Sequence, residues 1–435
     1  MMAPVEIGIL GIVLMLILIA LKVPVGFALI GIAILGNIML TDAGPALSKV
    51  GSDLIIMVNN YSLSVIPLFV LMGIFLSKAG VAADLYNVMS EIFKKVRGGM
   101  AIATLGAAAV FGAVCGSATA AASTIGSIAV PEMTKHQYNQ GLSASIASVG
   151  ATLGIIIPPS TTLILYGVIT EESIGQVLIA GLLPGIMLTV MLMITTYILL
   201  LLKPSLGPPV AGTQERIHIN LEKAKYVWPL PVIFVISIGG IYAGYFTPTE
   251  AGAAGAFLSL LLVMAMRRLS WAKFVDSISS ATTITAMVFA IVIGGKLFGI
   301  FLTRSRIPFG LSDFINSLQV SPFIIILIIL LIYTLMGFFM DELATIVIMT
   351  PIFYPIILEL GYNAIWFGVM TTMMNLTGLL TPPVGVASLV VAQVTKVPTG
   401  QVFRYQVPFW ITLIIGAIIV ALFPDIALFL PSLMY

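Results

Sequence analysis

The sequence contains one proline-containing segment twice, each time inside a long apolar stretch. Gly-Ile-Ile-Ile-Pro-Pro occupies positions 154–159 and Gly-Leu-Leu-Thr-Pro-Pro occupies 378–383, which is an offset of 224 positions. The same offset aligns Pro24 with Pro248, Pro131 with Pro355, Tyr138-Asn139 with Tyr362-Asn363, and Pro184 with Pro408. The pattern predicts an internal duplication of nearly the whole chain. Membrane helices that are broken at matching points of two halves indicate the binding site of a carrier.

Composition restricts the chain to one broad class of protein. Hydrophobic residues make up 60% of the 435 residues, charged residues make up 8%, and the mean hydropathy is +1.17. These values exclude a soluble globular domain and indicate a polytopic membrane protein. The net charge of +2 gives no reason to expect a nucleic-acid partner. The single cysteine, Cys115, excludes an internal disulfide and argues against a cysteine-based metal site, and we expect no bound cofactor.

Apolar runs predict an all-α fold made of two six-element halves, 1–202 and 228–435, joined by a cytoplasmic linker at 203–227. In the first half the runs are 5–21, 24–40, 61–79, 99–133, 143–170 and 174–202. In the second they are 228–245, 248–266, 276–302, 321–358, 364–395 and 406–430. The runs 99–133 and 321–358 are too long for one pass, since about 20 residues span a bilayer. Each has a polar centre, which predicts a re-entrant hairpin. The runs 143–170 and 364–395 contain the Pro-Pro pairs and are predicted to be broken helices. The first apolar run has no basic flank, so we expect an uncleaved helix.

The distribution of basic residues predicts an orientation. If the N-terminus lies outside and the hairpins do not cross, three basic residues fall outside, namely Lys49, Arg304 and Arg306, and Lys296 stays within the membrane. The other fifteen of the 19 fall inside: Lys22, Lys78, Lys94, Lys95, Arg97, Lys135, Lys203, Arg216, Lys223, Lys225, Arg267, Arg268, Lys273, Lys396 and Arg404. This bias follows the positive-inside rule. It places both termini in the periplasm and makes the second half an inverted copy of the first. Amphipathic stretches at 83–97 and 308–318 are expected to lie at the two interfaces.

The broken segments are candidate ion sites because a Pro-Pro pair removes two backbone donors. Non-helical backbone survives at membrane depth only around a protein-lined cavity. Carbonyls at 154–157 and 378–381 thereby lose their helical partners, and such carbonyls can coordinate a cation, while half-helix N-termini can face an anionic group. The alternative is a purely structural kink.

The two predicted hairpin tips carry different side chains. Ser117 and Thr119 lie in a run of small residues, where the alternative role is close helix packing. Asp341 and Glu342 lie in the middle of an apolar run, where a carboxylate is expensive and indicates a functional site, although it could also cap a helix. The offset pairs Asp341 with Ser117.

Two further residues are candidates for contacting a substrate. Lys296 could pair with a substrate carboxylate or with Asp341, or its side chain could extend to the outer interface. Asn375 precedes Gly378 by one turn and could orient the broken segment or join two helices. We assign Thr119, Lys296, Asp341 and Asn375 as candidate substrate contacts.

Motifs for several enzyme classes are absent from the sequence. There is no phosphate-binding loop, no His-Glu-x-x-His zinc motif and no nucleophile elbow. His136 and His218 fall in predicted cytoplasmic loops, where a solvated side chain is expected. We therefore do not expect an enzyme, and nothing resembles a channel selectivity filter.

Six longer motifs resemble the large membrane subunit of tripartite ATP-independent periplasmic (TRAP) transporters over essentially the full length. In the first half they are Phe-Gly-Ala-Val-Cys-Gly-Ser at 111–117, Gly-Ser-Ile-Ala-Val-Pro-Glu-Met at 126–133, and Gly-Ile-Ile-Ile-Pro-Pro-Ser at 154–160. In the second they are Met-Asp-Glu-Leu-Ala at 340–344, Trp-Phe-Gly-Val at 366–369, and Gly-Leu-Leu-Thr-Pro-Pro-Val-Gly at 378–385.

The resemblance implies an elevator-type carrier in the bacterial inner membrane, with a scaffold and a moving transport domain that holds both hairpins. It implies two partners, a small four-helix membrane subunit and a periplasmic substrate-binding protein. It also implies sodium-driven import of a small organic acid, such as a C4-dicarboxylate or a sialic acid.

The family's two sodium sites map onto this chain residue by residue. The first would involve Gly112, Cys115, Gly154, Ile157 and Pro159, with Ser117 nearby. The second would involve Gly337, Gly378, Thr381 and Val384. The family commonly has Ser-Gly-Ser where this chain has Cys115, Gly116 and Ser117. Since a thiol is a poor sodium ligand, Cys115 would contribute its carbonyl. The other reading of the sequence is a standalone sodium- or proton-coupled dicarboxylate or citrate symporter that needs no binding protein.

Overall fold

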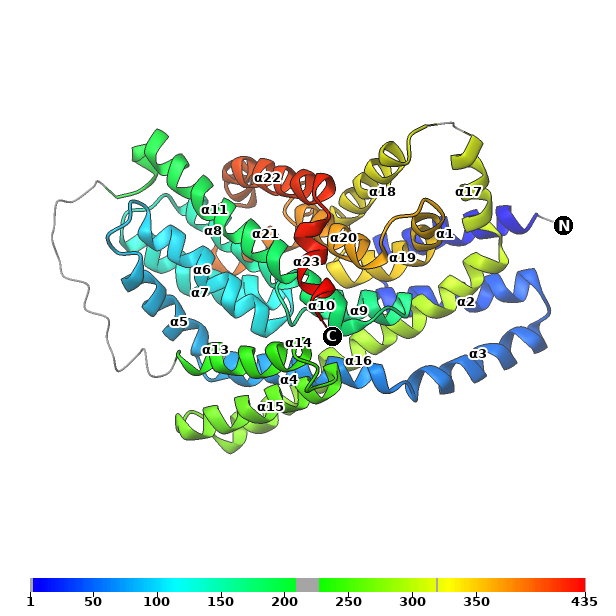
Figure 1. The fold of residues 1–435 in the computed structure, drawn as a ribbon, viewed down its shortest axis with the longest axis horizontal. Coiled ribbons are helices and arrows are strands. Elements are labelled where there is room, and N and C mark those ends of the chain that lie inside the picture. The colour runs from blue at the N-terminus through cyan, green and yellow to red at the C-terminus, as the bar shows by residue number, and fades with distance from the viewer. Residues whose placement is uncertain (1–2, 209–226, 318–319, 435) are drawn as a thin grey trace.

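A computed structural model of the chain describes residues 3–208, 227–317 and 320–434. The regular elements of these residues are all helices, drawn in Figure 1. Six of the described helices are long and apolar enough to cross a membrane, and seven shorter ones are also apolar. Most of the linker predicted at 203–227 lies outside the described residues, apart from the short helix η3 (Pro204–Leu206).

The helices before the first hairpin partly differ from the prediction. They are α1 (Pro4–Ala20), α2 (Val25–Leu40), α3 (Ala43–Val58), η1 (Tyr61–Ser64), α4 (Val65–Lys78) and α5 (Val81–Ile92). No apolar run had indicated α3, because only one face of this helix is apolar and Lys49 and Asp53 interrupt the run. The predicted amphipathic stretch at 83–97 forms α5, which begins and ends earlier than expected.

The helices before the second hairpin begin and end at positions that differ from those of the first half. They are α13 (Pro229–Phe234), the π-helix η4 (Val235–Gly239), α14 (Gly240–Tyr242), α15 (Pro248–Ala265), α16 (Trp271–Arg304) and α17 (Ile307–Ser317). Thr247 caps α15 by accepting a hydrogen bond from the backbone N–H of Glu250 at 3.3 Å, and Glu250 accepts from the Thr247 N–H at 2.8 Å. This reciprocal capping box fixes the start of the helix. The helix α16 is longer than the expected 276–302.

Each predicted hairpin consists of two helices. The first is formed by α6 (Gly99–Cys115) and α7 (Ala118–Lys135), and the second by α18 (Pro322–Gly337) and α19 (Glu342–Glu359). At the first tip Gly116 adopts a left-handed conformation, with φ of 65°, which favours glycine. The tip residues Ser117 and Asp341, which the repeat pairs, each precede the first residue of the returning helix.

Each predicted broken helix is interrupted at its Pro-Pro pair. The first consists of α8 (Gln140–Thr152), η2 (Leu153–Ile155) and α9 (Thr161–Thr170), and the second of α20 (Ala364–Gly378) and α21 (Val386–Thr395). Asn139 and Asn363 cap α8 and α20 with their side-chain oxygens, which explains why the repeat preserves an asparagine there. Both Pro-Pro peptide bonds are cis.

The chain after each broken helix returns along the bundle. It forms α10 (Ile174–Ala180) and α11 (Leu182–Leu202) in the first half, and α22 (Thr399–Leu422) and α23 (Asp425–Ser432) in the second. The single run expected at 406–430 is thus two helices, since the chain turns at Phe423 and Pro424.

The hairpins and broken helices interlock across the two halves. The helix α9 of the first half packs on α19 of the second hairpin, and α21 of the second half packs on α7 of the first hairpin. Figure 1 shows α6, α7 and α8 on the left and α18, α19 and α20 on the right, with α9 and α10 near the centre. Because every residue from Gly141 to Thr152 is buried and most are small, α8 can pack closely against both α6 and α7.

A second group of helices surrounds this interlocked part. The long α16 packs against α2 and α4, and α4 also packs against α15. Large apolar side chains remain exposed at helical spacing on the outer helices, for example Ile186, Val190 and Ile194 on α11 and Ile411, Ile415 and Ile418 on α22. Apolar stripes of this extent are the surface that a bilayer covers.

Candidate functional site

The first hairpin crosses the first broken helix at two glycines. A Cβ atom on Gly112 would lie 2.7 Å from the Cα of Gly154, and one on Gly154 would lie 2.5 Å from the Cα of Gly112. Only glycine permits this approach of two backbones. The crossing brings the end of α6 directly against the break in the first helix.

The second half repeats this arrangement. A Cβ atom on Gly378 would lie 2.8 Å from the Cα of Gly337, and one on Gly337 would lie 3.1 Å from the Cα of Gly378. The structure therefore brings together the glycines that the two candidate cation sites share, in two separate pairs. The two hairpins meet the two breaks in the same way.

Backbone oxygens line the first break. Pro158 and Pro159 have no N–H, so the carbonyls of Gly154 and Ile155 have no donor four residues later. The hydroxyl of Ser160 donates to the Ile155 carbonyl, and the hydroxyl of Thr161 donates to the carbonyl of Gly116 at the hairpin tip.

The remaining predicted residues of the first site lie at the same place. The Pro159 carbonyl faces the tip, since a Cβ on Gly116 would lie 3.4 Å from it. Ile157 is buried in the break, and Cys115, which is partly buried, ends α6.

The second break offers a hydroxyl in addition to carbonyls. Thr381 donates its hydroxyl hydrogen to the Thr377 carbonyl at 2.8 Å, which leaves the lone pairs of its oxygen for another partner. Its backbone N–H donates to the Gly378 carbonyl at 2.9 Å. Val384 is partly buried in the same segment. The predicted residues of the second site therefore lie together as well.

The two breaks differ in their burial. Pro158 and Pro159 are buried, whereas Pro382 and Pro383 are exposed. The first break is covered by the connection between α10 and α11 and by the first turn of α11. A Cβ on Gly181, in the connection, would lie 2.3 Å from the Ile156 carbonyl oxygen, and one on Gly185, in α11, would lie 2.5 Å from the Ile157 side chain. The sequence comparison of the two motifs had not indicated this difference, because the covering glycines lie outside the motifs.

The tips of the two hairpins contact one another. The backbone N–H of Ala118, the first residue of α7, donates to Oε1 of Glu342, the first residue of α19, at 3.2 Å. These two residues are also separated by 224 positions, so the contact joins equivalent points of the repeat. Ser117 and Thr119 hold their hydroxyls 3.1 Å apart on the first tip. The centre of the molecule thus contains two helix N-termini that face each other, which are places of partial positive charge.

Acidic and amide side chains surround the second tip. Asp341 caps its own helix by accepting a hydrogen bond from the Ala344 N–H at 2.7 Å, so the predicted capping role is present. Asn375 donates its Nδ2 hydrogen to the Glu342 carbonyl at 2.9 Å. A Cβ on Gly337 would lie 3.1 Å from Asn375 Oδ1, so this amide oxygen lies beside the second crossing. Asn375 therefore joins the broken helix to the hairpin.

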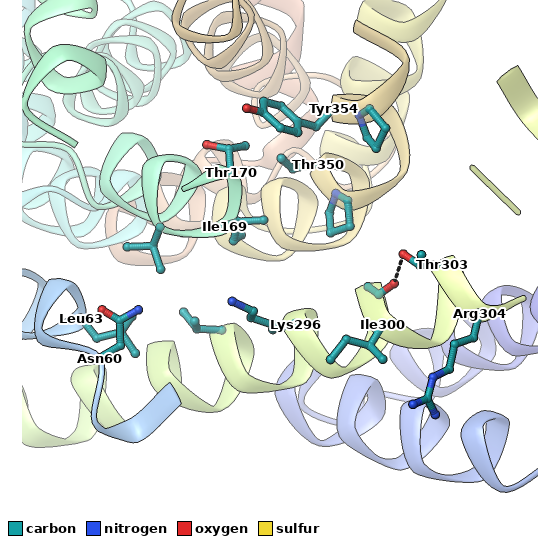
Figure 2. Close-up of a pocket in the computed structure, with 15 residues that line it drawn as sticks. Asn60, Leu63, Ile169, Thr170, Lys296, Ile300, Thr303, Arg304, Thr350 and Tyr354 are labelled. Carbon is teal, nitrogen blue, oxygen red and sulfur yellow. Dashed lines mark hydrogen bonds between the residues drawn. The ribbon is translucent and has the colours of Figure 1, made fainter. Parts of the chain in front are cut away.

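Lys296 does not lie with the tips, and its interaction with Asp341 is not observed. It extends from α16 into a pocket of about 430 Å³ whose other walls are η1, α9 and α19, and no tip residue lines this pocket. Figure 2 shows its side chain directed into the pocket, whereas that of Arg304 turns away from it. The Lys296 ammonium pairs with Glu171 at 3.3 Å, and Arg304 donates to the Asn37 side chain at 3.0 Å.

Two close helix crossings could not be recognised as important from the sequence. A Cβ on Gly73 of α4 would lie 2.6 Å from the Val114 carbonyl oxygen near the first tip, and one on Gly295 of α16 would lie 1.8 Å from the Val347 side chain of the second hairpin. These isolated glycines lie in the surrounding helices and belong to no motif. They let α4 and α16 approach the two hairpins.

The interlocked hairpins, the two broken helices and the apolar outer surface define a polytopic membrane protein of the transporter class. The chain shares its fold with the YdaH transporter of Alcanivorax borkumensis, with a TM-score of 0.67 over 96% of this chain and 98% of that one, at 12% sequence identity. At this identity the likeness concerns the fold alone.

Sequence comparisons place the chain within a family. Residues 12–426 match the family model described as "Tripartite ATP-independent periplasmic transporter, DctM component". The chain is 35% identical to the C4-dicarboxylate TRAP transporter large permease protein DctM of Pseudomonas aeruginosa, over 86% of this chain and 87% of that protein. It is 29% identical to the sialic acid TRAP transporter large permease protein SiaM of Vibrio cholerae, over 94% and 95% of the two chains. The chain belongs to the family of TRAP transporter large membrane subunits.

Membership confirms the resemblance drawn from the motifs and several of its consequences. The chain is a multi-pass protein of the inner membrane and a subunit of a secondary transporter for organic acids. Large subunits of this family work with a small membrane subunit and a periplasmic binding protein.

Proposed function

We propose that this chain couples the inward movement of sodium ions to the import of a small organic acid, a C4-dicarboxylate or a sialic-acid-like carboxylate, which a periplasmic binding protein delivers. The proposal rests on one observation above all: each hairpin meets the broken helix of its own half at a glycine pair, and the two tips meet each other at Ala118 and Glu342. Names of the relatives support the substrate class.

Sodium is proposed to bind where each hairpin meets its break. The residues at both places suit a small hard cation, because both offer backbone carbonyls and the second also offers the Thr381 hydroxyl. At the first break the ligands would be the carbonyls of Cys115, Ile157 and Pro159, enclosed by the crossing of Gly112 and Gly154. Binding at either place would tie a tip to a broken helix and so order the space between the tips.

The substrate is proposed to bind between the ordered tips. The Ser117 and Thr119 hydroxyls and the first turn of α7 face this space with donors, and Ser117 does not use its side chain to cap α7. Asp341 would contact the substrate or a water molecule beside it. Lys296, in the pocket between α16 and the interlocked helices, would attract an anion on its way to or from the tips.

An elevator movement is proposed for the transport step. The interlocked helices α6–α9 and α18–α21 would move as one body against a scaffold that includes α2, α4, α15 and α16. Their interlocking supports this division. The positive-inside bias supports two inverted halves with both termini in the periplasm, and we propose a four-helix protein as the small subunit.

Reconstitution of the complete transporter tests the proposal. Proteoliposomes that contain the large and small subunits should accumulate the organic acid only when the loaded binding protein and an inward sodium gradient are both present. A potassium gradient of the same size is the control. Accumulation that continues unchanged without a sodium gradient would contradict the sodium coupling, and accumulation of free acid without the binding protein would favour a standalone symporter.

A further inference from the structure

The carboxyl groups of Asp341 and Glu342 are adjacent at the start of α19, and they accept hydrogen bonds from different parts of the chain. Asp341 accepts a hydrogen bond from its own helix at Ala344. Glu342 instead turns toward the other hairpin, where its Oε1 atom accepts from Ala118. Glu342 is 3% exposed, so its carboxyl group is enclosed between the two tips.

No basic side chain among the described residues neutralises this pair. In the described parts of the chain, lysine, arginine and histidine form ion pairs elsewhere, for example Arg268 with Asp84 and Lys296 with Glu171, and none lies within ion-pair distance of Asp341 or Glu342. A buried charge without a partner is strongly destabilising. The carboxyl groups between the tips must therefore hold a proton or be compensated by a positively charged ligand.

Two buried oxygen atoms at this place also have no partner among the described residues. They are Oε2 of Glu342 and Oδ1 of Asn375, whose residues are 3% and 0% exposed. The orientation of the Asn375 amide is fixed, since its nitrogen donates to the Glu342 carbonyl. An ionised carboxylate and an amide oxygen can only accept hydrogen bonds. Their missing partners are therefore donors or a cation.

The backbone oxygens around Glu342 already accept hydrogen bonds. This distinguishes a metal ion from a cation that carries N–H groups. The Glu342 carbonyl accepts from Asn375, and the Asp341 carbonyl accepts from both the N–H and the hydroxyl of Thr345. A metal ion needs several oxygen ligands at once, whereas each N–H of an ammonium or amidinium group needs a single acceptor. The two unpartnered oxygens are therefore better suited to the N–H groups of an ammonium or amidinium group than to a metal ion.

We propose that Glu342 and Asn375 form a subsite for a positively charged N–H group of the transported solute, so that the solute is an acid that also carries an ammonium or amidinium group. This inference rests on the proposed function, because it takes the space between the tips as the substrate site. Among the organic acids named above, a simple dicarboxylate placed there would face Asp341 and Glu342, and such like-charge contacts are strongly unfavourable. The inference therefore narrows the proposed substrate class to an acid that carries its own positive N–H group. A charge-assisted hydrogen bond to Glu342 supplies both the missing charge and the missing donor.

The thermal stability of the purified chain in detergent, titrated with simple cations, tests the subsite without knowledge of the solute. Methylammonium chloride should raise the melting temperature saturably. Tetramethylammonium chloride, which has the same charge and no N–H, should not. Sodium chloride is titrated separately. Equal effects of the two organic cations would overturn the proposal, and this comparison needs no variant.

Two variants locate the effect. Glu342→Gln removes the charge at nearly constant volume and should weaken the apparent affinity for methylammonium by at least about tenfold. Asp425→Asn is the matched control, because Asp425 is an exposed carboxylate in the first turn of α23, and its titration should match that of the wild type. A Glu342→Gln protein with unchanged methylammonium affinity would contradict the assignment.

The sodium titration separates this inference from the proposed function. If sodium stabilises the wild type and methylammonium does not, the cation sites stand and only the subsite is wrong. If Glu342→Gln weakens sodium binding while methylammonium has no effect in either protein, Glu342 serves the coupling ion and the subsite proposal is overturned. Absence of any sodium effect on the wild type would contradict the proposed sodium sites instead.

Discussion

Gly112 and Gly154 lie so close that neither can carry a side chain, since a Cβ atom on either would lie within 2.7 Å of the other's Cα. Gly337 and Gly378 repeat this relationship in the second half of the chain. Each pair joins the end of a hairpin helix to the point where a second helix stops. The candidate cation sites therefore depend on backbone proximity more than on any side chain.

Gly154→Ala should separate the first hairpin from its break. The new methyl group would meet backbone atoms of Gly112, which cannot move aside as a flexible side chain can, and overpacking of this kind costs about 1–3 kcal/mol. The variant should melt at a lower temperature than the wild type and lose much of its stabilisation by sodium. Gly31→Ala is the control, because a Cβ on Gly31 meets nothing within 4 Å. A Gly154→Ala protein with wild-type sodium stabilisation would show that the crossing does not form a cation site.

Thr381→Val tests the side-chain ligand at the second break. Valine keeps the shape of threonine but removes the oxygen, so the sodium concentration for half-maximal uptake should rise by about tenfold, which corresponds to about 1.4 kcal/mol. Thr381→Ser should remain close to the wild type. Thr395→Val provides the comparison, since the Thr395 hydroxyl also bonds to a carbonyl four residues earlier and lies outside the break. Equal effects of Thr381→Val and Thr395→Val would assign to Thr381 a purely structural role.

The local features of this fold follow from its sequence. A Pro-Pro pair stops a helix wherever it occurs, and an asparagine such as Asn139 or Asn363 starts one, so both broken helices could be located from the residues alone. The long apolar runs with polar centres likewise indicated both hairpins. In each case the physical cause lies within a few residues of its effect.

Features that depend on distant segments could not be predicted in this way. The partner of Lys296 is Glu171, which is 125 positions away, and the pairing depends on how α16 packs beside α9. The contact of Glu342 with Ala118 requires both hairpins to be in place. The burial of Pro158 and Pro159 depends on the connection between α10 and α11. The helix α3 was not recognised because a half-exposed helix has no continuous apolar run.

Lys296→Met should affect uptake more than stability. The Lys296 and Glu171 side chains are 47% and 78% exposed, and ion pairs of this kind contribute about 0–1 kcal/mol. If Lys296 attracts the substrate, its replacement should raise the KM for uptake by about tenfold, and Lys296→Arg should restore most of the loss. Glu171→Gln is the matched control, since it breaks the same ion pair but leaves the ammonium group in the pocket, and its KM should stay the same or fall. Similar KM values for Lys296→Met and Glu171→Gln would exclude a role for Lys296 in attracting the substrate.

The proposed orientation can be tested with cysteines, because the chain has a single one to remove. In a Cys115→Ala background, Lys49→Cys and Asp313→Cys should react with a membrane-impermeant maleimide in intact cells, since both positions are exposed and fall on the predicted periplasmic side. Lys135→Cys and Arg404→Cys, which are also exposed but predicted to face the cytoplasm, should react only after the cells are opened.

Each pair takes one position from each half of the chain, and uptake by every variant controls for correct insertion. Labelling of Lys49→Cys and Lys135→Cys from the same side would exclude the first hairpin as drawn, because the chain between these positions would then cross the membrane an even number of times. Labelling of Arg404→Cys in intact cells, with Asp313→Cys labelled only after the cells are opened, would contradict the inverted repeat.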